Sequence, residues 1–228
     1  MHRELKIKTI LIYGGSFDPP HYGHLNTALA VQNDLCFEQF VFMPCKLPAL
    51  KEATIASSEQ RLCMLQLMLN DYPQFEIDTR ELSRPGPSYM VDSLNSFRNE
   101  LGNDASITLL LGMDAFIQLP EWHCYEQIFS RCHLLVMKRK IEKDVVLPEP
   151  LSKKLLAHEV FDKSLLLAHP FGSICLYDAG QYPISSSWLK SQIPTGRNLD
   201  AYLPAPVLKY IQEEELYLTP VITSAKTP

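Results

Sequence analysis

Short apolar runs alternate with stretches of helical periodicity along most of this chain. Each run is brief and continuously apolar, which is typical of strands buried on both faces of a parallel sheet. Strands that alternate with helices predict βαβ units, right-handed crossovers and an α/β fold with helices on both faces of the sheet. The expected strands span residues 9–13, 40–43, 75–79, 107–111, 134–137 and 174–177. The expected helices begin near residues 23, 58, 88, 185 and 206, and the last of them is expected to reach residue 216.

The length of the chain predicts a single domain spanning residues 1–228, because domains usually hold about 100–200 residues. The stretch 138–170 interrupts the alternation: it starts Lys-rich, continues with the sequence LPEP and ends in a weakly helical segment. We expect it to be a segment inserted into the same domain. The sequence carries no signal for an oligomeric state or for a lid function of this segment.

Charge and hydropathy exclude several classes of protein. The formal net charge of −5 disfavours nucleic acid as a partner, although a few local donors can still bind an anionic substrate. The N-terminal apolar run is too short for a signal peptide and no stretch of 18 apolar residues occurs, so no membrane partner is expected. The six cysteines lack zinc-binding spacing, which predicts free thiols in a reducing cytoplasm.

The segment GGSFDPPHYGHL, beginning at Gly14, follows the first expected strand and opens the first expected helix. Ligands of parallel sheets bind at that carboxyl end of a strand. Gly14 and Gly15 allow a phosphate to approach the backbone, and Gly23 does so where free N–H groups and the helix dipole favour an anion. His21 and His24 are three residues apart, so both rings are expected to face the same way and to form a two-donor clamp over the anion.

Taken alone, either histidine is better explained as a surface residue, and the glycines as a turn before a capped helix. Chance is a poor explanation for the ordered combination of strand, GGSFDP, HxGH and helix. The segment differs from the GxGxxG dinucleotide fingerprint, and no GKS or GKT phosphate loop occurs in the chain. The motif therefore predicts a phosphate-binding site of another type.

The segment resembles the signature of the HxGH nucleotidylyltransferases, which join a nucleoside triphosphate to a phosphate-bearing acceptor and release pyrophosphate. Further matches in the same order extend the resemblance to the bacterial nicotinate-nucleotide adenylyltransferases. The resemblance covers nearly the whole chain and implies a Rossmann-like parallel sheet. The matching segments are SSEQRLCML at 57–65, SY at 88–89, GMD at 112–114, Trp122, ISSSWLK at 184–190 and LPAPVLKYI at 203–211.

The resemblance implies transfer of the adenylyl group of ATP to nicotinate mononucleotide in NAD biosynthesis. An acceptor phosphate oxygen would attack the α-phosphorus directly, so catalysis requires positioning and charge stabilisation rather than a protein nucleophile. His21 and His24 are the expected catalytic residues, and Mg²⁺ is expected to arrive with ATP without a dedicated protein metal site. The expected ATP-binding residues are Gly14, Gly15, Ser16, Phe17, His21, Gly23, His24, Gly112, Asp114, Ser185, Ser187 and Lys190. The expected acceptor-binding residues are Ser16, Tyr89, Trp122 and Arg139.

Four positions depart from the family pattern. Lys190 stands where the family usually has arginine, and a lysine lacks the bidentate fork of a guanidinium. Ser187 replaces threonine but keeps the hydroxyl, and Leu50 replaces the histidine of a PPHK segment. Met90 replaces the threonine of SYT. If that threonine reads the nicotinate carboxylate, backbone N–H groups must distinguish the acid from the amide here.

Several alternatives stay open at this point. Trp122 is expected to stack on the pyridine ring, yet it could equally be a core residue. Arg139 could belong to a solvated basic run, and Asp114 could cap a turn. The alternative functions are phosphopantetheine adenylyltransferase, nicotinamide mononucleotide adenylyltransferase and, less favoured, a non-catalytic nucleotide-binding protein on the same fold.

Overall fold

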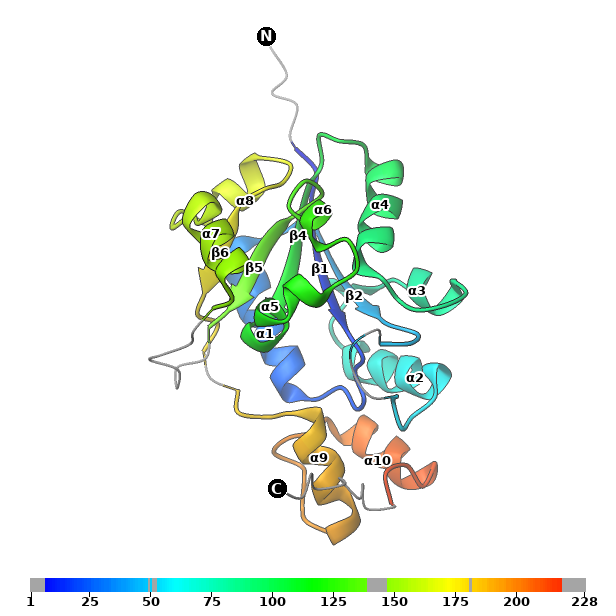
Figure 1. Cartoon of the computed structure of the whole chain (residues 1–228). Helices are drawn as coiled ribbons and strands as arrows, with labels where there is room; N and C mark the ends of the chain where they lie inside the picture. Colours follow the sequence, from blue (N-terminus) through cyan, green and yellow to red (C-terminus); the bar gives the residue numbers. More distant parts are fainter. Residues whose placement is uncertain (1–6, 49, 51–52, 139–146, 181, 219–228) are drawn as a thin grey trace, which may run out of the picture.

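Six parallel strands form one sheet in the order β3-β2-β1-β4-β5-β6 (Figure 1). The computed structural model describes residues 7–48, 50, 53–138, 147–180 and 182–218. β1 pairs with β2 on one side and with β4 on the other, so the strand order changes direction between β1 and β4. The parallel α/β sheet predicted from the sequence is confirmed. The strands are β1 Thr9–Gly15, β2 Gln39–Pro44, β3 Phe75–Ile77, β4 Ser106–Gly112, β5 His133–Met137 and β6 Ile174–Tyr177.

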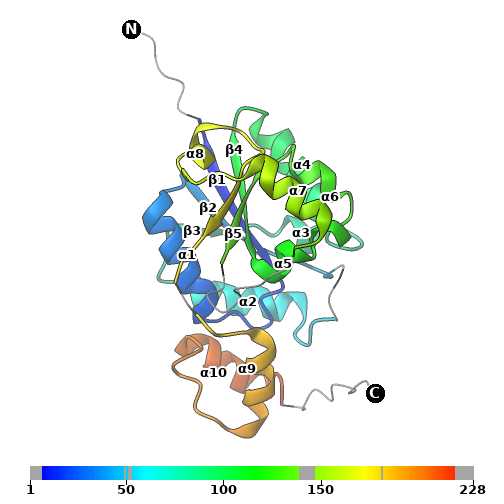
Figure 2. The same cartoon turned by 60° about the vertical axis from the view of Figure 1, so that its left-hand side comes forward.

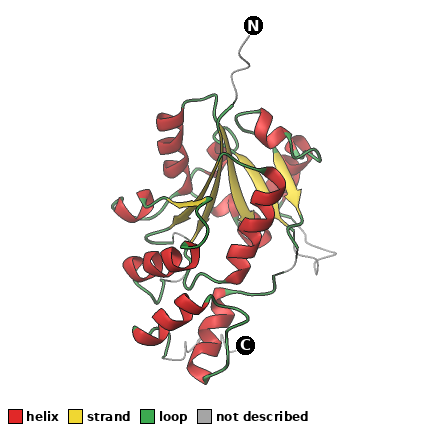
Figure 3. Ribbon diagram, turned by 180° about the vertical axis from the view of Figure 1, so that it is seen from behind, coloured by secondary structure: helices red, strands yellow, loops and turns green. Residues whose placement is uncertain are grey.

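Helices cover both faces of the sheet, which Figures 1 and 3 show from opposite sides. Alternate strand residues enter two separate cores, because successive side chains of a strand point to opposite faces. Leu11 and Phe42 pack with α1, α2 and α10, whereas Ile12 and Val41 pack with α4 and α7. The helices are α1 Tyr22–Leu35, α2 Ser58–Leu69, α3 Arg80–Ser83, α4 Met90–Leu101, α5 Met113–Ile117, α6 Tyr125–Ile128, α7 Glu149–His158, α8 Leu165–Ala168, α9 Ser186–Gln192 and α10 Ala205–Glu213, with short 3-10 turns at Leu119–Glu121 and Ile193–Thr195.

Local sequence explains where several elements begin and end. Ser57 starts α2 with a reciprocal cap: its hydroxyl accepts from the Gln60 amide at 3.2 Å, and its own amide donates to the Gln60 side chain at 3.0 Å. The third strand was expected to reach residue 79 but ends at Ile77. The Asp78 carboxylate accepts from the Arg80 backbone amide at 2.8 Å and from its guanidinium, which turns the chain into α3.

The expected insertion at 138–170 returns to the sheet through α7 and α8. Leu151 lies fully buried in one core and Leu166 in the other. The Val160 amide donates to the Ile174 carbonyl at 2.9 Å, which fixes the segment beside β6. Residues 139–146, and with them the predicted acceptor ligand Arg139, lie outside the described residues.

The last helices gather beyond the ends of the strands. Figure 2 shows α9 and α10 together below the sheet, next to the start of α1. The Tyr22 amide, at the first residue of α1, donates to the Tyr202 carbonyl at 3.0 Å. Ligands of open α/β sheets bind at the carboxyl ends of the strands, near the change in strand order. The fold therefore brings the second predicted motif to the same edge of the sheet as the first.

All six cysteines lie within the described residues and are free thiols, as the sequence predicted. In the part of the chain that the structure describes, no helix combines the length and the apolar character needed to cross a membrane.

Candidate active site

A cavity of about 540 Å³ opens at the carboxyl ends of β1 and β4. Its walls come from the end of β1, the loop after β2, the start of α4, the end of β4 and the segment after α5. Six predicted site residues line it, namely Gly14, Gly15, Ser16, Tyr89, Gly112 and Trp122. Further lining residues that the sequence did not single out include Tyr13, Cys45, Glu81, Gln118 and His123. The cavity therefore joins the glycine turn to the predicted acceptor side.

Gly14 and Gly23 leave room for neighbouring side chains. A Cβ atom on Gly14 would lie 2.9 Å from the terminal methyl of Met90, which is itself a cavity-lining residue. A Cβ atom on Gly23 would lie 2.9 Å from the His21 ring and 3.4 Å from the Cβ of Ile184. A side chain at Gly23 would therefore displace the His21 ring.

The two histidines lie against each other, as their spacing predicted. Their rings stack with centroids 3.7 Å apart and an interplanar angle of 25°. The His21 backbone amide donates to Nδ1 of His24 at 3.3 Å. A neutral imidazole that accepts at Nδ1 carries its proton on Nε2, so His24 offers a donor there. The edges of Tyr13 and Phe17 also contact the His24 ring, at centroid distances of 6.0 and 5.1 Å.

His21 is largely buried, whereas a two-donor clamp requires both rings to be accessible to the ligand. Only 4% of the residue is exposed, and its Nδ1 atom has no hydrogen-bond partner. Burial lowers the pKa of His21 to about 3, because a charged ring loses its hydration there. At neutral pH the ring is therefore uncharged and supports His24 by stacking. The sequence predicted the pairing of the rings but not this burial.

Phe17 was expected among the ATP-binding residues, but its side chain is 1% exposed. It packs against Tyr13 and Phe42 with centroid distances of 5.8 and 5.7 Å. The backbone of Phe17 adopts a positive φ of 48°. Phe17 therefore belongs to the core.

The second motif meets the first through hydrogen bonds from Ser186 and Lys190. Ser185 caps α9, and its hydroxyl accepts from the Trp188 amide at 3.2 Å. The Ser186 hydroxyl donates to the Pro19 carbonyl at 2.9 Å, which fixes the start of α9 beside the HxGH loop. Ser185 and Ser187 are exposed. Both predicted serine ligands are thus placed at the end of α9 that faces the loop.

Lys190 contacts a carboxylate that the sequence did not single out. Its Nζ atom lies 2.9 Å from Oδ2 of Asp18, within the GGSFDP loop. The Tyr217 hydroxyl donates to the other oxygen of Asp18 at 2.7 Å. Burial by itself would raise the pKa of Asp18, but the hydrogen bonds from Lys190 and Tyr217 outweigh it and hold the pKa below its usual value. The carboxylate is therefore charged at neutral pH.

A buried guanidinium fixes the glycine turn from behind. Arg61 is fully buried, and its Nη1 donates to the Ser16 carbonyl at 2.7 Å. Its Nη2 donates to the Lys46 carbonyl at 3.2 Å and the Ser58 hydroxyl at 3.2 Å. Arg61 thereby holds the loop after β1 against the loop after β2. Its place in the SSEQRLCML segment was the only sequence signal for this role.

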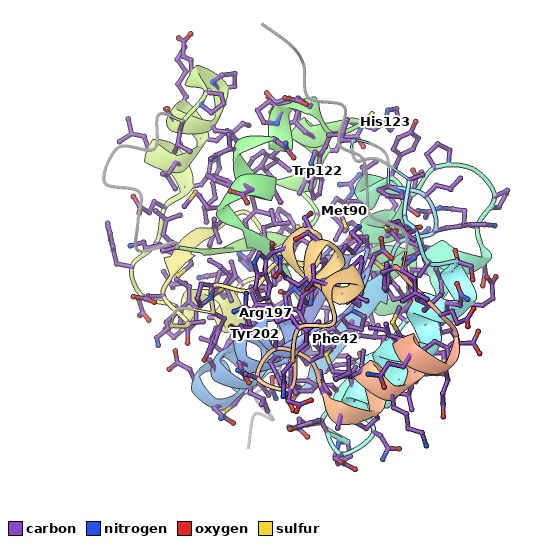
Figure 4. All side chains as sticks on the ribbon, turned by 90° about the horizontal axis from the view of Figure 1, so that it is seen from below. Phe42, Met90, Trp122, His123, Arg197 and Tyr202 are labelled. Atoms are coloured by element: carbon purple, nitrogen blue, oxygen red, sulfur yellow. The ribbon has the colours of Figure 1, made fainter. Side chains whose placement is uncertain are left out.

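Aromatic rings form the far wall of the cavity. The Tyr89 and His123 rings stack at 4.4 Å with an interplanar angle of 30°. Trp122 lines the cavity and also packs against the core of α4 and α7, so it fits both of its predicted interpretations. Figure 4 looks toward this edge of the molecule and labels Met90, Trp122 and His123. Gly112 borders open space, and Asp114 is exposed at the first turn of α5.

Hydrogen-bond donors and the Lys190 ammonium lie around the loop that follows the glycine turn, whereas the cavity lining reaches that turn but includes neither the two histidines nor Lys190. Donors of this kind suit an anionic ligand and a reaction governed by positioning and charge stabilisation. Among the described residues, no three histidine, cysteine, aspartate or glutamate side chains are grouped to hold a metal ion.

Comparison with known proteins gives consistent results. The profile of the cytidylyltransferase-like family matches residues 12–192. A probable nicotinate-nucleotide adenylyltransferase of Legionella pneumophila (strain Paris) is 46% identical over 209 residues, which cover 92% of this chain and 99% of that protein. A protein of the same name from Methylococcus capsulatus is 41% identical over 207 residues, covering 90% of this chain and 98% of that protein.

Solved structures show the same fold. The nicotinic acid mononucleotide adenylyltransferase of Plasmodium falciparum complexed with NaAD superposes with a TM-score of 0.70 and 20% identity. The superposition covers 92% of this chain and 97% of that chain. The Rossmann-like arrangement expected from the sequence is thereby confirmed.

Proposed function

Because the chain belongs to the nicotinate-nucleotide adenylyltransferases, within the cytidylyltransferase-like family, we propose that it transfers the adenylyl group of ATP to nicotinate mononucleotide. The products are nicotinate adenine dinucleotide and pyrophosphate, and the reaction belongs to NAD biosynthesis. One observation carries the proposal within this structure: the aromatic-walled cavity opens directly onto the turn that leads into the stacked histidines. An acceptor in the cavity would have its phosphate beside a triphosphate held at that turn.

The reaction requires no covalent intermediate with the protein. A phosphate oxygen of the acceptor attacks the α-phosphorus of ATP, a new P–O bond forms, and the bond to the β-phosphate breaks as pyrophosphate leaves. Catalysis then consists of holding the two phosphates in line and stabilising the charge of the transition state. The Nε2–H of His24 and the N-terminus of α1 supply neutral donors, and Lys190 supplies positive charge.

Apart from Phe17, Lys190 and the residues of the HxGH motif, the predicted ATP-binding residues lie at three places in the fold. Gly14, Gly15 and Ser16 offer backbone groups at the end of β1, and Ser185 and Ser187 offer hydroxyls at the start of α9. Gly112 and Asp114, at the end of β4, would hold the ribose of ATP, since the space beside Gly112 is open.

The acceptor would occupy the cavity between α4 and the segment after α5. Trp122 would stack on the pyridine ring, and the Tyr89–His123 pair would close the side of the cavity. α4 begins at Met90, so its free backbone N–H groups and its dipole favour the carboxylate of nicotinate over the amide of nicotinamide.

Mg²⁺ would enter with ATP. Bound to the phosphates, the ion neutralises charge on the nucleotide. The Asp18 carboxylate beside the HxGH motif already accepts four hydrogen bonds, so phosphate oxygens and waters would be the main ligands of the ion.

A pyrophosphate-release assay with ATP and Mg²⁺ tests the proposal against its alternatives. The acceptors are nicotinate mononucleotide, nicotinamide mononucleotide and 4′-phosphopantetheine, with CTP replacing ATP as a control. We expect the highest kcat/KM with nicotinate mononucleotide and little turnover of CTP. Faster turnover of nicotinamide mononucleotide would reject the acceptor, and faster turnover of 4′-phosphopantetheine would favour that activity. ATP binding without pyrophosphate release from any acceptor would favour a non-catalytic protein.

A further inference from the structure

The Asp18 carboxylate connects three distant parts of the chain to the HxGH loop. Its Oδ1 accepts from the Ala56 amide at 3.1 Å and from the Tyr217 hydroxyl at 2.7 Å. Its Oδ2 accepts from the Ile55 amide at 3.1 Å and from Lys190 Nζ at 2.9 Å. Asp18 is 2% exposed, so these four donors replace water around the charge. The direction of the carboxylate is therefore set by all four together.

Tyr217 reaches this carboxylate from a turn beyond α10. The chain was expected to continue as a helix to residue 216, but α10 ends at Glu213. Glu215 and Tyr217 then adopt positive φ angles of 52° and 62°, which residues other than glycine rarely adopt. This turn leaves Tyr217 only 3% exposed. The backbone after α10 is thus shaped in a way that brings one hydroxyl to Asp18.

Lys190 stands at the other oxygen of the same carboxylate. An ammonium group has three N–H donors, and Asp18 uses one of them. The side chain of Lys190 is 20% exposed, whereas that of Asp18 is 2% exposed. The Lys190 side chain is therefore more accessible to an approaching phosphate than the carboxylate that it contacts.

We propose that Tyr217 is a positioning residue for the triphosphate of ATP: by holding Asp18, it fixes the direction in which Lys190 presents its remaining donors. The inference rests on the proposed function, because it takes Lys190 as a phosphate ligand. A lysine makes a single contact with Asp18 where an arginine could make two. The direction of Lys190 thus depends on a carboxylate that is itself immobilised, and the Tyr217 hydroxyl is the side-chain donor that completes this restraint beside the Ile55 and Ala56 amides.

The test variant is Tyr217→Phe, which removes only the hydroxyl. We expect KM for ATP to rise about tenfold, as removal of one hydrogen bond to a charged group allows. KM for nicotinate mononucleotide should stay unchanged and kcat should fall less than about twofold, since neither the cavity nor His24 is altered. The matched control is Tyr177→Phe, which removes a hydroxyl that donates to Asp34 at 2.6 Å. The control should leave all these constants unchanged.

A double-variant cycle separates positioning from a general structural role. In a Lys190→Met background, Tyr217→Phe should produce no further rise in KM for ATP, because no ammonium is left to position. In a Lys190→Arg background its effect should shrink to about twofold, because a guanidinium can hold both oxygens of Asp18. An unchanged KM in Tyr217→Phe, or an equal rise in the wild-type and Lys190→Met backgrounds, would overturn the proposal.

Direct titration of ATP in the absence of acceptor distinguishes this inference from the proposed function. If the wild-type protein binds ATP but turns over none of the three acceptors, the function fails. The inference then stands if Tyr217→Phe weakens ATP binding about tenfold in the wild-type background and not in Lys190→Met. A wild-type protein that binds no ATP would overturn both. The thermal unfolding midpoint of each variant shows that binding is compared between folded proteins.

Discussion

Two clusters of the same three residue types lie near the two ends of α1. Asp18, just before the helix, binds Lys190 and Tyr217, and Asp34, near the end of the helix, binds Lys163 and the Tyr177 hydroxyl. The clusters differ in burial: the side chain of Asp18 is 2% exposed and that of Asp34 is 34% exposed.

The difference in burial changes how much the same contacts contribute to the stability of the fold. Water screens the charges at Asp34 and can replace either partner, so exposed ion pairs of this kind add little to stability. At Asp18 no water can replace a lost donor, so the removal of one partner leaves a buried charge unsatisfied. The carboxylate of the buried cluster also belongs to the GGSFDP loop, which leads into the HxGH motif. Similar residues therefore form a surface contact at one end of α1 and a structural part of the candidate site at the other.

The largest expected difference concerns the carboxylates themselves. Asp18→Asn removes the negative charge and replaces one of the two acceptor oxygens by an NH2 group that faces donors, so either the Lys190 side or the Tyr217 side loses its acceptor. We expect a loss of about 3–5 kcal/mol in the free energy of unfolding. Asp34→Asn should cost less than about 1 kcal/mol, because its partners turn to water. Urea unfolding of both variants measures the two losses. Equal losses of unfolding free energy in the two variants would show that the difference in burial does not make the Asp18 contacts more stabilising than the Asp34 contacts.

The second difference concerns the two lysines. Lys190→Met should lower kcat/KM for ATP about 100-fold, because it removes the positive charge beside the transferred phosphates. Lys163→Met removes the same charge from the exposed cluster and should leave kcat/KM within about twofold of the wild type. The pyrophosphate-release assay compares both variants at a temperature where both are folded. A similar loss of kcat/KM in both variants would contradict the assignment of Lys190 as a phosphate ligand.

The third comparison concerns the pH dependence of stability, to which buried histidines contribute. Burial lowers the pKa of His21 to about 3 and that of His133 to about 4. In the unfolded chain both rings protonate near their ordinary pKa of about 6.5, so stability is lost as the pH falls below that value. Between pH 7 and pH 5 each buried histidine should cost about 2 kcal/mol.

The measurement is urea unfolding at several pH values. His133→Gln removes one of the two rings and should reduce the loss between pH 7 and pH 5 by about half. Carboxylates with lowered pKa values, such as Asp18, lose their contribution only at more acidic pH. An unchanged pH dependence in His133→Gln would assign the acid sensitivity to other groups.

The sequence predicted the sheet because the relevant signals are local. A short apolar run such as TILIY at 9–13 indicates a buried strand without knowledge of its neighbours. The meeting of His21 with His24 also followed from a spacing of three residues. The residues that line the cavity on both sides, such as Gly14 and Trp122, were found from motifs whose order matched a known family.

The buried cluster could not be predicted in this way. Asp18 and Tyr217 are separated by 199 positions, and neither belongs to a periodic pattern that would bring them together. The positive φ angles at Glu215 and Tyr217 oppose local preference, so the sequence favoured a longer helix than the one observed. Ile184, just before α9, likewise lies close to Gly23 of the HxGH motif across a long separation in the chain. Contacts between distant segments, rather than local propensity, complete the candidate site.

The smallest expected effect sharpens the comparison between the two lysines. Lys190→Arg introduces the residue that the family usually has, and its planar fork can bind Asp18 and a phosphate oxygen at the same time. We expect KM for ATP to fall about threefold, because less side-chain freedom is lost for each hydrogen bond formed. Lys163→Arg should change nothing, since the exposed cluster already exchanges its contacts with water. Steady-state titration of ATP measures both constants. A rise in KM for Lys190→Arg would mean that the loop around Asp18 has adapted to the smaller ammonium group, and the Tyr217 hydroxyl would then be the first contact to re-examine.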